Sequence, residues 1–470
     1  MKAIVVLVVG LVVGIVVPFF WASPLPVFLG AALIALAGLL VKRLVPALVG
    51  IVAAILLVLT PGLINGYRDG QGVAWTVPED ENLMLAEGVL AVTSVDREPV
   101  LRGRDLRTGE RRWELTLPER TGDAGNVRVW RAGATLLVAG FDDRLRGVDI
   151  ASGRVRWEAP PADTRFVGVT DREHVALTRC PAPSECEVQS LSLEDGRVAW
   201  KAPTSNAEFL GVPLPDDGAS QRDLRPWPAS FVLVTDKRRY DVRDLVTGRV
   251  LATGNQRDGS TAILGDVLVR STDEGALTAT NAQTGAQLWS RPAGDGKASR
   301  SPVVTMDGLA VLEGQLLLTG SGDPTDGVRI GDRLRVLIIG TGKIRERPVD
   351  VDFDLADVLT SDQPTGKWPV VFWRDYDGDA SATKVIAGDH EYARDNTRNV
   401  DVAPRLLGFG SEGHTWGTGL ERVYEVFDRD SGERILRYAG EDVSVFARGD
   451  VLVLRDGDDD DAPQQVIVTP

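Results

Sequence analysis

The distribution of apolar residues divides the chain into an N-terminal part with three long apolar stretches and a longer part with short alternating segments. Residues 3–20, 26–41 and 45–64 carry no charged side chain, and each is close to the ~20 residues that cross a hydrocarbon core as a helix. A cleaved signal peptide is the alternative for the first stretch, but no convincing small-x-small site follows it and two more stretches come after it. The pattern predicts a membrane anchor of three transmembrane helices over residues 1–66.

The positive charges of this anchor predict its orientation. Lys2 precedes the first stretch, Lys42 and Arg43 lie between the second and the third, and the loop 21–25 has no charge. The positive-inside rule places the N-terminus and the Lys42–Arg43 loop in the cytoplasm. We therefore expect a multi-pass protein of the plasma membrane whose residues 67–470 form an extracytoplasmic domain.

Beyond residue 70, short alternating segments broken by Gly, Asp and Pro predict β-strands. A turn of the form Asp-x-x-Thr-Gly-x-x-x-Trp recurs among them. The strong copies contain Gly109 and Trp113, Gly153 and Trp157, Gly196 and Trp200, and Gly285 and Trp289. The weaker copies contain Gly248, Gly432 and the eroded Gly340-Thr-Gly342, with Ala252 and Leu436 in the Trp place of the first two.

The residue types of this repeat indicate its structure. An Asp, Asn or Ser four residues before the Gly accepts backbone N–H bonds in a tight turn, and the Gly supplies a positive φ. The Trp lies on the outgoing strand and can bury about 200 Å² against a neighbouring unit. A period of about 45 residues with four strands is the size of a β-propeller blade. The doubled spacing between Gly342 and Gly432 indicates either a blade without its turn or an insertion at 350–400.

The two ends of the domain have complementary deficits. Gly70–Pro78, which contains Trp75, copies the end of a repeat without the strands before it. At the C-terminus, Val443–Phe446, Val451–Leu454 and Gln464–Val468 are expected strands without a Trp-bearing fourth. Joining both ends completes one blade and removes an exposed sheet edge. The count then favours eight blades, with seven as the alternative.

These units resemble the PQQ-like repeat family, the β-propellers of quinoprotein alcohol dehydrogenases and BamB-type assembly proteins, over about residues 72–470. The resemblance implies an all-β, eight-bladed propeller in which Trp75, Trp113, Trp157, Trp200 and Trp289 dock neighbouring blades. It does not imply the quinone. The dehydrogenases use a disulfide between adjacent cysteines, a calcium ion and an Asp base, and none of these can be placed residue by residue here. We therefore expect no PQQ cofactor.

The two cysteines are expected to form a disulfide. Cys180 and Cys186 close a short loop between the strand-like segments 174–178 and 187–191. Such a bridge at a hairpin tip suits an oxidising compartment, in agreement with an extracytoplasmic domain. Two free thiols in a reducing compartment are the alternative.

Candidate metal and nucleic-acid chemistry is sparse. Asp375–Ser381 has alternating carboxylates, as in a calcium loop, but Ile386 occupies the place of the distal Glu, which favours a solvated turn. Asp456–Asp461 is a run of like charges of the kind found in exposed loops, and calcium binding there is left open. The chain carries −15, and residues 1–66 have three basic and no acidic residues, so the domain carries −18. Such a charge repels nucleic-acid phosphates, and we expect no nucleic-acid partner.

The expected function is that of a non-enzymatic scaffold that binds a protein or envelope component. The alternative is an oxidoreductase of the quinoprotein type, or a small-ligand sensor, with a divergent central site. Residues 350–400 lack the repeat and contain the possible interaction residues Trp368, Phe372, Trp373 and Tyr376. Aromatic residues among charges are typical of binding patches. The alternative is a degenerate blade in which Phe372 and Trp373 belong to the core.

Overall fold

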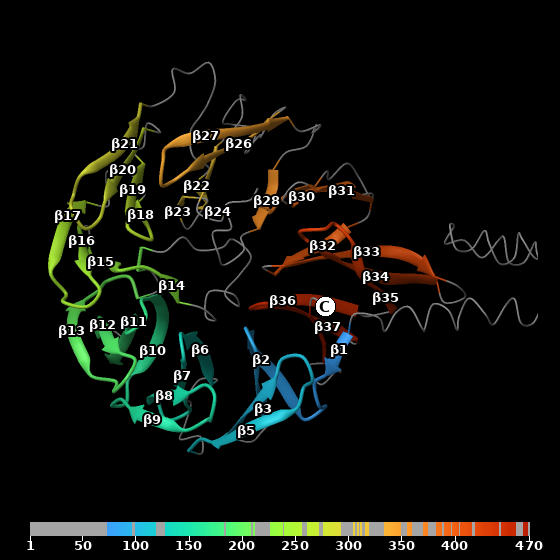
Figure 1. The fold of residues 1–470 in the computed structure, drawn as a ribbon, viewed down its shortest axis with the longest axis horizontal. Helices are drawn as coiled ribbons and strands as arrows, with labels where there is room; N and C mark the ends of the chain where they lie inside the picture. The colour runs from blue at the N-terminus through green and yellow to red at the C-terminus, as the bar shows by residue number, and fades with distance from the viewer. Residues whose placement is uncertain are drawn as a thin grey trace, which may run out of the picture.

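The computed structural model describes most of residues 73–468, and the longest stretches that it leaves out are 212–225, 293–303, 319–332 and 360–369. The described residues form strands and turns. Their antiparallel sheets lie side by side around a ring (Figure 1). The fold of the described residues is all-β, as the alternating segments of the sequence predict.

In the first half of the ring, successive stretches of chain form successive sheets, and the Trp-bearing strand is the outer one (Figure 1). The first sheet contains β2 (Glu81–Glu87), β3 (Leu90–Val95), β4 (Val100–Asp105) and β5 (Arg111–Thr116). The second contains β6 (Arg128–Ala132), β7 (Thr135–Ala139), β8 (Leu145–Asp149) and β9 (Val155–Glu158). The third contains β10 (Asp163–Thr170), β11 (His174–Ala182), β12 (Glu185–Ser192) and β13 (Val198–Pro203), with β14 (Trp227–Pro228) parallel to β10.

The same order continues in the second half. The next two sheets contain β15 (Phe231–Asp236), β16 (Arg239–Asp244) and β17 (Val250–Asn255), then β18 (Thr261–Leu264), β19 (Val267–Ser271), β20 (Leu277–Asn281) and β21 (Gln287–Arg291). A ribbon of β22 (Val304–Thr305) and β23 (Gly308–Leu309) precedes β24 (Val311–Leu312), β25 (Gln315–Leu318), β26 (Arg333–Ile338) and β27 (Lys343–Pro348). The last two contain β28 (Leu355–Leu359), β29 (Val370–Arg374), β30 (Ala382–Ala387) and β31 (His390–Asp395), then β32 (Thr397–Val402), β33 (Leu406–Thr415), β34 (Gly419–Asp428) and β35 (Arg434–Gly440).

The ring closes with a sheet made from both ends of the domain, in the order β1 (Val73–Thr76), β38 (Gln464–Ile467), β37 (Val451–Asp456) and β36 (Val443–Arg448). Polar contacts join this sheet to the first one. The Gln464 side chain accepts a hydrogen bond from the Leu83 N–H at 3.2 Å and donates one to Asn82 at 3.1 Å. The Gly88 N–H donates to the Asp450 carboxylate at 2.7 Å.

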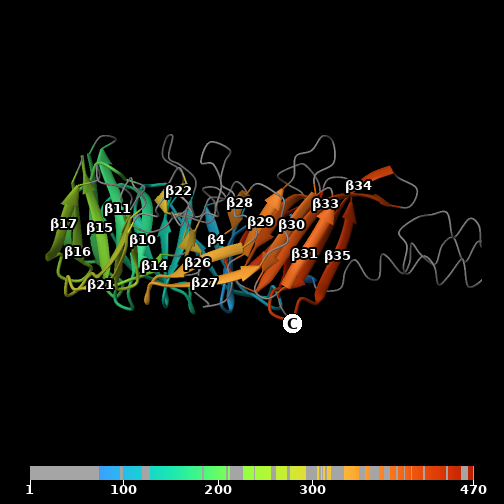
Figure 2. The ribbon, with the colours of Figure 1, turned by 90° about the horizontal axis from the view of Figure 1, so that it is seen from above.

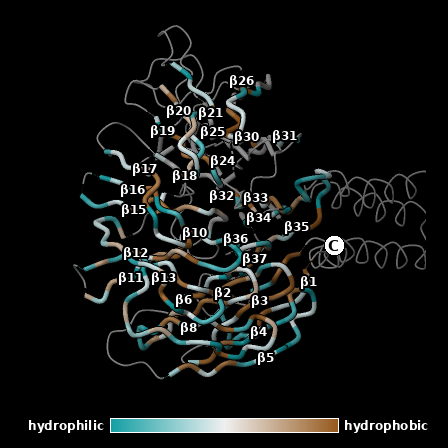
Figure 3. Tube along the Cα trace, turned by 60° about the vertical axis from the view of Figure 1, so that its left-hand side comes forward, coloured by the Kyte–Doolittle hydropathy of each residue, from teal (hydrophilic) through white to brown (hydrophobic). Residues whose placement is uncertain are grey.

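The hydrophobic core consists of separate clusters between neighbouring sheets. Strand β7 is buried along four of its five residues because both faces of its sheet are covered by other sheets. One cluster joins the first two sheets through Leu101, Trp113 and Leu136, and another joins the closing sheet to the first through Trp75 and Val453. Along many other strands, hydrophobic and hydrophilic residues alternate (Figure 3). Each sheet is therefore stabilised mainly by its two neighbours.

The segment 350–400, expected to be an insertion or a degenerate blade, contains the four-stranded sheet β28–β31. With it, the described residues form nine sheets of three to five strands, so the predicted count of eight blades is not confirmed. Within the described part of the chain, no helix is long and apolar enough to cross a membrane. The predicted spans 3–20, 26–41 and 45–64 lie outside the described residues.

The strands run between two ends of the ring (Figure 2). One end, here called the turn end, carries the glycine turns of the repeats, such as the turn between β4 and β5. The other, here called the disulfide end, carries the hairpin between β11 and β12. Strand β1 begins at the turn end, because Val73 pairs with Ile467 and Ile467 pairs with Leu452, close to the Gly449 turn that contacts the β2–β3 turn.

Candidate functional site at the repeat turns

The repeat turns have a common hydrogen-bond pattern. In the turn between β4 and β5, the Asp105 carboxylate accepts the N–H groups of Arg107 at 2.9 Å and Thr108 at 3.0 Å. The Gly109 N–H donates to the Asp105 carbonyl at 2.9 Å, and Gly109 has a φ of +70°. The turns that begin at Asp149, Asp244, Asn281 and Asp428 repeat this pattern. The polar residue and the glycine thus build the same rigid turn in each of these units.

Each tryptophan of the repeat lies on the turn of the next unit, not on its own. The Trp113 ring covers Gly153, so that a Cβ on Gly153 would lie 2.7 Å from the ring. The Trp113 indole N–H donates to the Ile150 carbonyl, three residues before that glycine, at 2.9 Å. We call this pair of groups, the glycine and the carbonyl three residues before it, a tryptophan seat. It fixes the outer strand of one sheet to the turn of the next.

Five seats are filled in this way, with indole N–H to carbonyl distances of 2.7–3.0 Å. The pairs of ring and glycine are Trp75 and Gly109, Trp113 and Gly153, Trp157 and Gly196, Trp200 and Gly248, and Trp289 and Gly342. The residue opposite the Trp on the neighbouring strand is small in four of them, namely Gly103, Gly147, Ser190 and Ala279. Trp75 instead faces Val466, so a valine there is compatible with a filled seat.

Two seats differ, and one of them holds a residue that the sequence analysis missed. The His390 ring covers Gly432, so that a Cβ on this glycine would lie 2.7 Å from the ring, and His390 Nε2 lies 3.0 Å from the Asp430 carbonyl. His390 therefore covers the glycine as a tryptophan does, but its ring contacts the carbonyl two residues before the glycine and not three. No Asp-x-x-Thr-Gly motif lies between β30 and β31, and His390 pairs with Ala387, three positions earlier, at the start of β31. At the other seat, Gly285, the preceding outer strand carries Ala252, and no ring of a described residue covers the glycine.

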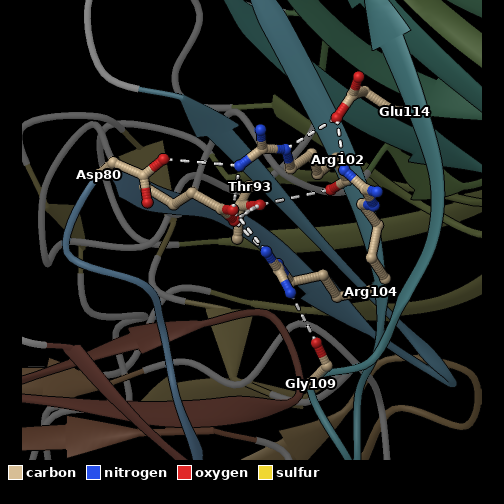
Figure 4. A network of polar contacts seen from close by, with 8 residues as sticks. Asp80, Thr93, Arg102, Arg104, Gly109 and Glu114 are labelled. Atoms are coloured by element: carbon tan, nitrogen blue, oxygen red, sulfur yellow. Dashed lines mark hydrogen bonds and ion pairs between the residues drawn. The ribbon is translucent and has the colours of Figure 1, made fainter.

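A buried ion-pair network crosses the first sheet below its turn (Figure 4). The Glu81 side chain is fully buried and accepts hydrogen bonds from Arg102 at 2.6 Å, from Arg104 at 2.8 Å and from the Thr93 hydroxyl. Arg102 also pairs with Glu114 at 3.0 Å. Burial by itself would raise the pKa of Glu81, but the hydrogen bonds from Arg104, Thr93 and Arg102 hold this pKa below its ordinary value. The network keeps Glu81 ionised and links all four strands.

Similar pairs occur in the second sheet. There, Arg146 is 4% exposed and bonds both Asp142, at 2.5 Å, and Glu158, at 3.1 Å. The hydroxyl of Ser152 and the guanidinium of Arg156 lower the pKa of Asp149 to about 2. These charged groups bond to one another and to the turns, so they rigidify the sheets that carry the seats.

Cys180 and Cys186 form a disulfide across the β11–β12 hairpin. The neighbouring Arg179 is buried and donates to the carbonyls of Pro160 at 2.5 Å and Ala162 at 3.2 Å. Burial lowers the pKa of this guanidinium. At the disulfide end of the third sheet, the disulfide therefore joins β11 to β12, and the Arg179 hydrogen bonds join β11 to the loop after β9.

The structure places only part of the predicted interaction patch. Phe372 and Trp373 lie in β29, in the sheet β28–β31, which is the position that a degenerate blade would give them. Trp368 and Tyr376 lie outside the described residues, as do all of Asp375–Ser381 and most of Asp456–Asp461, the two candidate calcium segments. Within the described residues, no group of three or more His, Cys, Asp or Glu side chains is arranged to hold a metal ion.

Turns, seats and sheets of this kind define a β-propeller built from PQQ-like repeats. A family model described as outer membrane protein assembly factor BamB matches residues 69–172 and 167–323, which is more than half of the chain. The chain belongs to this PQQ-like repeat family. No curated protein sequence matches it significantly.

Three solved structures that match this chain share little sequence with it. BamB from Moraxella catarrhalis is 15% identical, with a TM-score of 0.32, over 67% of this chain and 87% of that chain. The computationally designed Ika8 protein is 10% identical, with a TM-score of 0.40, over 85% and 100%. Quinohemoprotein alcohol dehydrogenase ADHIIG from Pseudomonas putida HK5 is 13% identical, with a TM-score of 0.36, over 82% and 72%. The family match, and not these likenesses, assigns the family.

Proposed function

We propose that this protein is a membrane-anchored, extracytoplasmic propeller that acts as a non-enzymatic scaffold and binds a protein partner through the turn end of its ring. One observation carries the proposal. All six exposed large hydrophobic side chains among the described residues belong to the turn end, namely Val89, Val155, Val198, Val246, Val250 and Leu288. They are distributed over five successive sheets, so the turn end offers apolar contacts to a partner along this part of the ring.

The entry point of the chain supports the orientation. The last predicted span ends at residue 64, and β1 begins at Val73 on the turn end. Eight intervening residues reach at most about 28 Å when fully extended. The turn end therefore faces the plasma membrane, the disulfide end points away from it, and the partner has a part close to the membrane surface.

We propose no quinone for this site. Quinoprotein dehydrogenases, which the repeats resemble, use a disulfide between adjacent cysteines, whereas Cys180 bonds a cysteine six positions away. The oxidoreductase and sensor alternatives stay predictions without an observation that favours them. A calcium ion at Asp456–Asp461 also stays a prediction.

Site-specific photo-crosslinking in intact cells tests the scaffold proposal. A photoreactive residue at Val155 or Val198, on the turn end, should give a discrete adduct with one protein. The same residue at Glu185, an exposed position at the disulfide end, is the matched control and should not give this adduct. Adducts only from Glu185, or none from either turn-end position, would contradict the proposal.

Topology is tested in the same cells by labelling single cysteines with an impermeant thiol reagent. A cysteine near Gly254 should react and one near Lys42 should not, because the propeller is proposed to lie outside and the Lys42 loop inside. Labelling only of the cysteine near Lys42 would show that the orientation is the opposite of the proposed one.

A further inference from the structure

One tryptophan seat is formed but not filled by a ring. The turn Asn281–Gly285 has the same structure as the others: the Asn281 side chain accepts the N–H groups of Gln283 at 3.1 Å and Thr284 at 2.8 Å, and Gly285 has a φ of +71°. A Cβ built on Gly285 meets no described heavy atom within 4 Å. Gly285 is exposed, whereas the glycines of the five filled seats are buried or half-buried. The turn therefore holds its shape without a ring.

The seat is open because the preceding repeat has no aromatic residue. Ala252 occupies the Trp position of β17, opposite Val242, and packs on the cluster that contains Ala282. Ala282 lies three residues before Gly285, so its carbonyl is the counterpart of the acceptors used by the five indoles. Within the described residues, no side chain donates a hydrogen bond to it. Both elements of the seat, the bare glycine and the carbonyl, are thus in place.

Exposed apolar side chains occur in both repeats that meet at this position. Val246 and Val250 lie in and just after the turn that precedes Ala252, and each is 43% exposed. Leu288 follows Gly285 by three residues on β21 and is 45% exposed. Half of the exposed large hydrophobic residues of the turn end thus belong to the two repeats that meet at the open seat.

We propose that the open seat binds a tryptophan side chain of the partner protein, with the ring on Gly285 and the indole N–H donating to the Ala282 carbonyl. The occupant is inferred from the chain itself, in which five seats of the same construction each hold an indole. The proposal rests on the scaffold function and specifies the anchor residue that the scaffold recognises. A tryptophan that fills a preformed pocket is the kind of residue that carries most of the affinity at an interface.

Binding of N-acetyl-L-tryptophanamide to the full chain in detergent tests the seat directly. Methyl NMR signals of Val246, Val250 and Leu288 should shift saturably with this probe and much less with N-acetyl-L-leucinamide. Ala252→Trp fills the seat from within, because Trp75 and Val466 show that a valine opposite the ring is tolerated. This variant should bind the probe at least tenfold more weakly, whereas Ala252→Ser should bind it as the wild type does.

Other outcomes would overturn the proposal. Shifts that do not saturate, or an unchanged affinity in Ala252→Trp, would show that the probe does not bind at the seat. If the methyl signals of the wild type do not shift with the probe, the seat either holds another tryptophan of this chain or binds no tryptophan, and the proposal fails. Ala252→Phe provides a second filled seat if Ala252→Trp does not fold, and it should also weaken binding. Adducts from Val155 and Val198 that persist when probe binding fails would leave the scaffold function standing and remove only this proposal.

Discussion

Alanine at Gly196 should destabilise the protein by about 3 kcal/mol more than alanine at Gly285, although the two glycines have nearly the same backbone conformation. Their φ values are +70° and +71°, so the left-handed backbone costs about 1–2 kcal/mol in either variant. At Gly285 the new methyl group meets no described atom. At Gly196 it would lie 2.5 Å from the Trp157 ring, which must leave the seat.

The cost of displacing Trp157 follows from its contacts. The side chain is 7% exposed, and re-exposing half of its about 200 Å² costs about 2.5 kcal/mol at about 25 cal/mol per Å². Loss of the hydrogen bond to the Leu193 carbonyl, now 3.0 Å long, adds about 1 kcal/mol. Urea unfolding of the full chain, compared at equal m-values, measures the difference.

A second control separates the ring contact from the backbone effect. Gly133 has a φ of +61° and also meets no described atom with a built Cβ, so Gly133→Ala should resemble Gly285→Ala. Hydrogen exchange at the Leu193 turn should rise only in Gly196→Ala. Equal destabilisation in all three variants would refute the idea that filled seats hold the sheets together.

Three further predictions concern the network, the histidine seat and the disulfide. Glu81→Gln should lose about 2–4 kcal/mol at neutral pH, because it removes the buried negative charge that pairs with the half-buried Arg102 and Arg104. Since the folded-state pKa of Glu81 is lowered, the wild type should also lose this stability as the pH falls through that folded-state pKa, whereas the variant should not, as urea unfolding from pH 7 to pH 3 will show. His390→Ala, which uncovers Gly432, should cost about 1–2 kcal/mol, and His390→Trp should restore most of it; equal midpoints for both variants would exclude a seat role. Replacing Cys180 and Cys186 by serine should cost about 2 kcal/mol by the loop-closure relation and leave the turn-end crosslinks intact, as urea midpoints and crosslinking will show.

The repeat turns and their tryptophans are predictable from the sequence because the turn is local. Five residues contain both the acceptor, such as Asp105, and the glycine that closes the turn, and the Trp follows at a fixed offset. From this pattern one can predict only that the Trp packs against a neighbouring unit. That the ring covers the glycine of the next repeat depends on the angle between sheets, which no local signal encodes.

Features that depend on distant residues were not predicted. Glu81 meets Arg102 and Arg104 across three strands, and nothing near any of them in sequence marks the pair. His390 fills a seat, although the connection between β30 and β31 that precedes it contains no Asp-x-x-Thr-Gly motif. In each case the groups meet only in the folded chain, so their spacing in the sequence does not reveal the contact.

The open seat is compatible with a stable ring because the sheets interact mainly with their neighbours. In such an arrangement, the total stability is close to a sum of the sheets and of the interfaces between them, as in other repeat proteins. At the interface between β15–β17 and β18–β21, Tyr240, Val242 and Ile263 are buried without any tryptophan. Leaving one seat open therefore weakens one interface and exposes one glycine, while the closing sheet still joins both ends of the domain. A ring held by several identical contacts can thus present one of them to a partner, and Gly285 is the position where this chain does so.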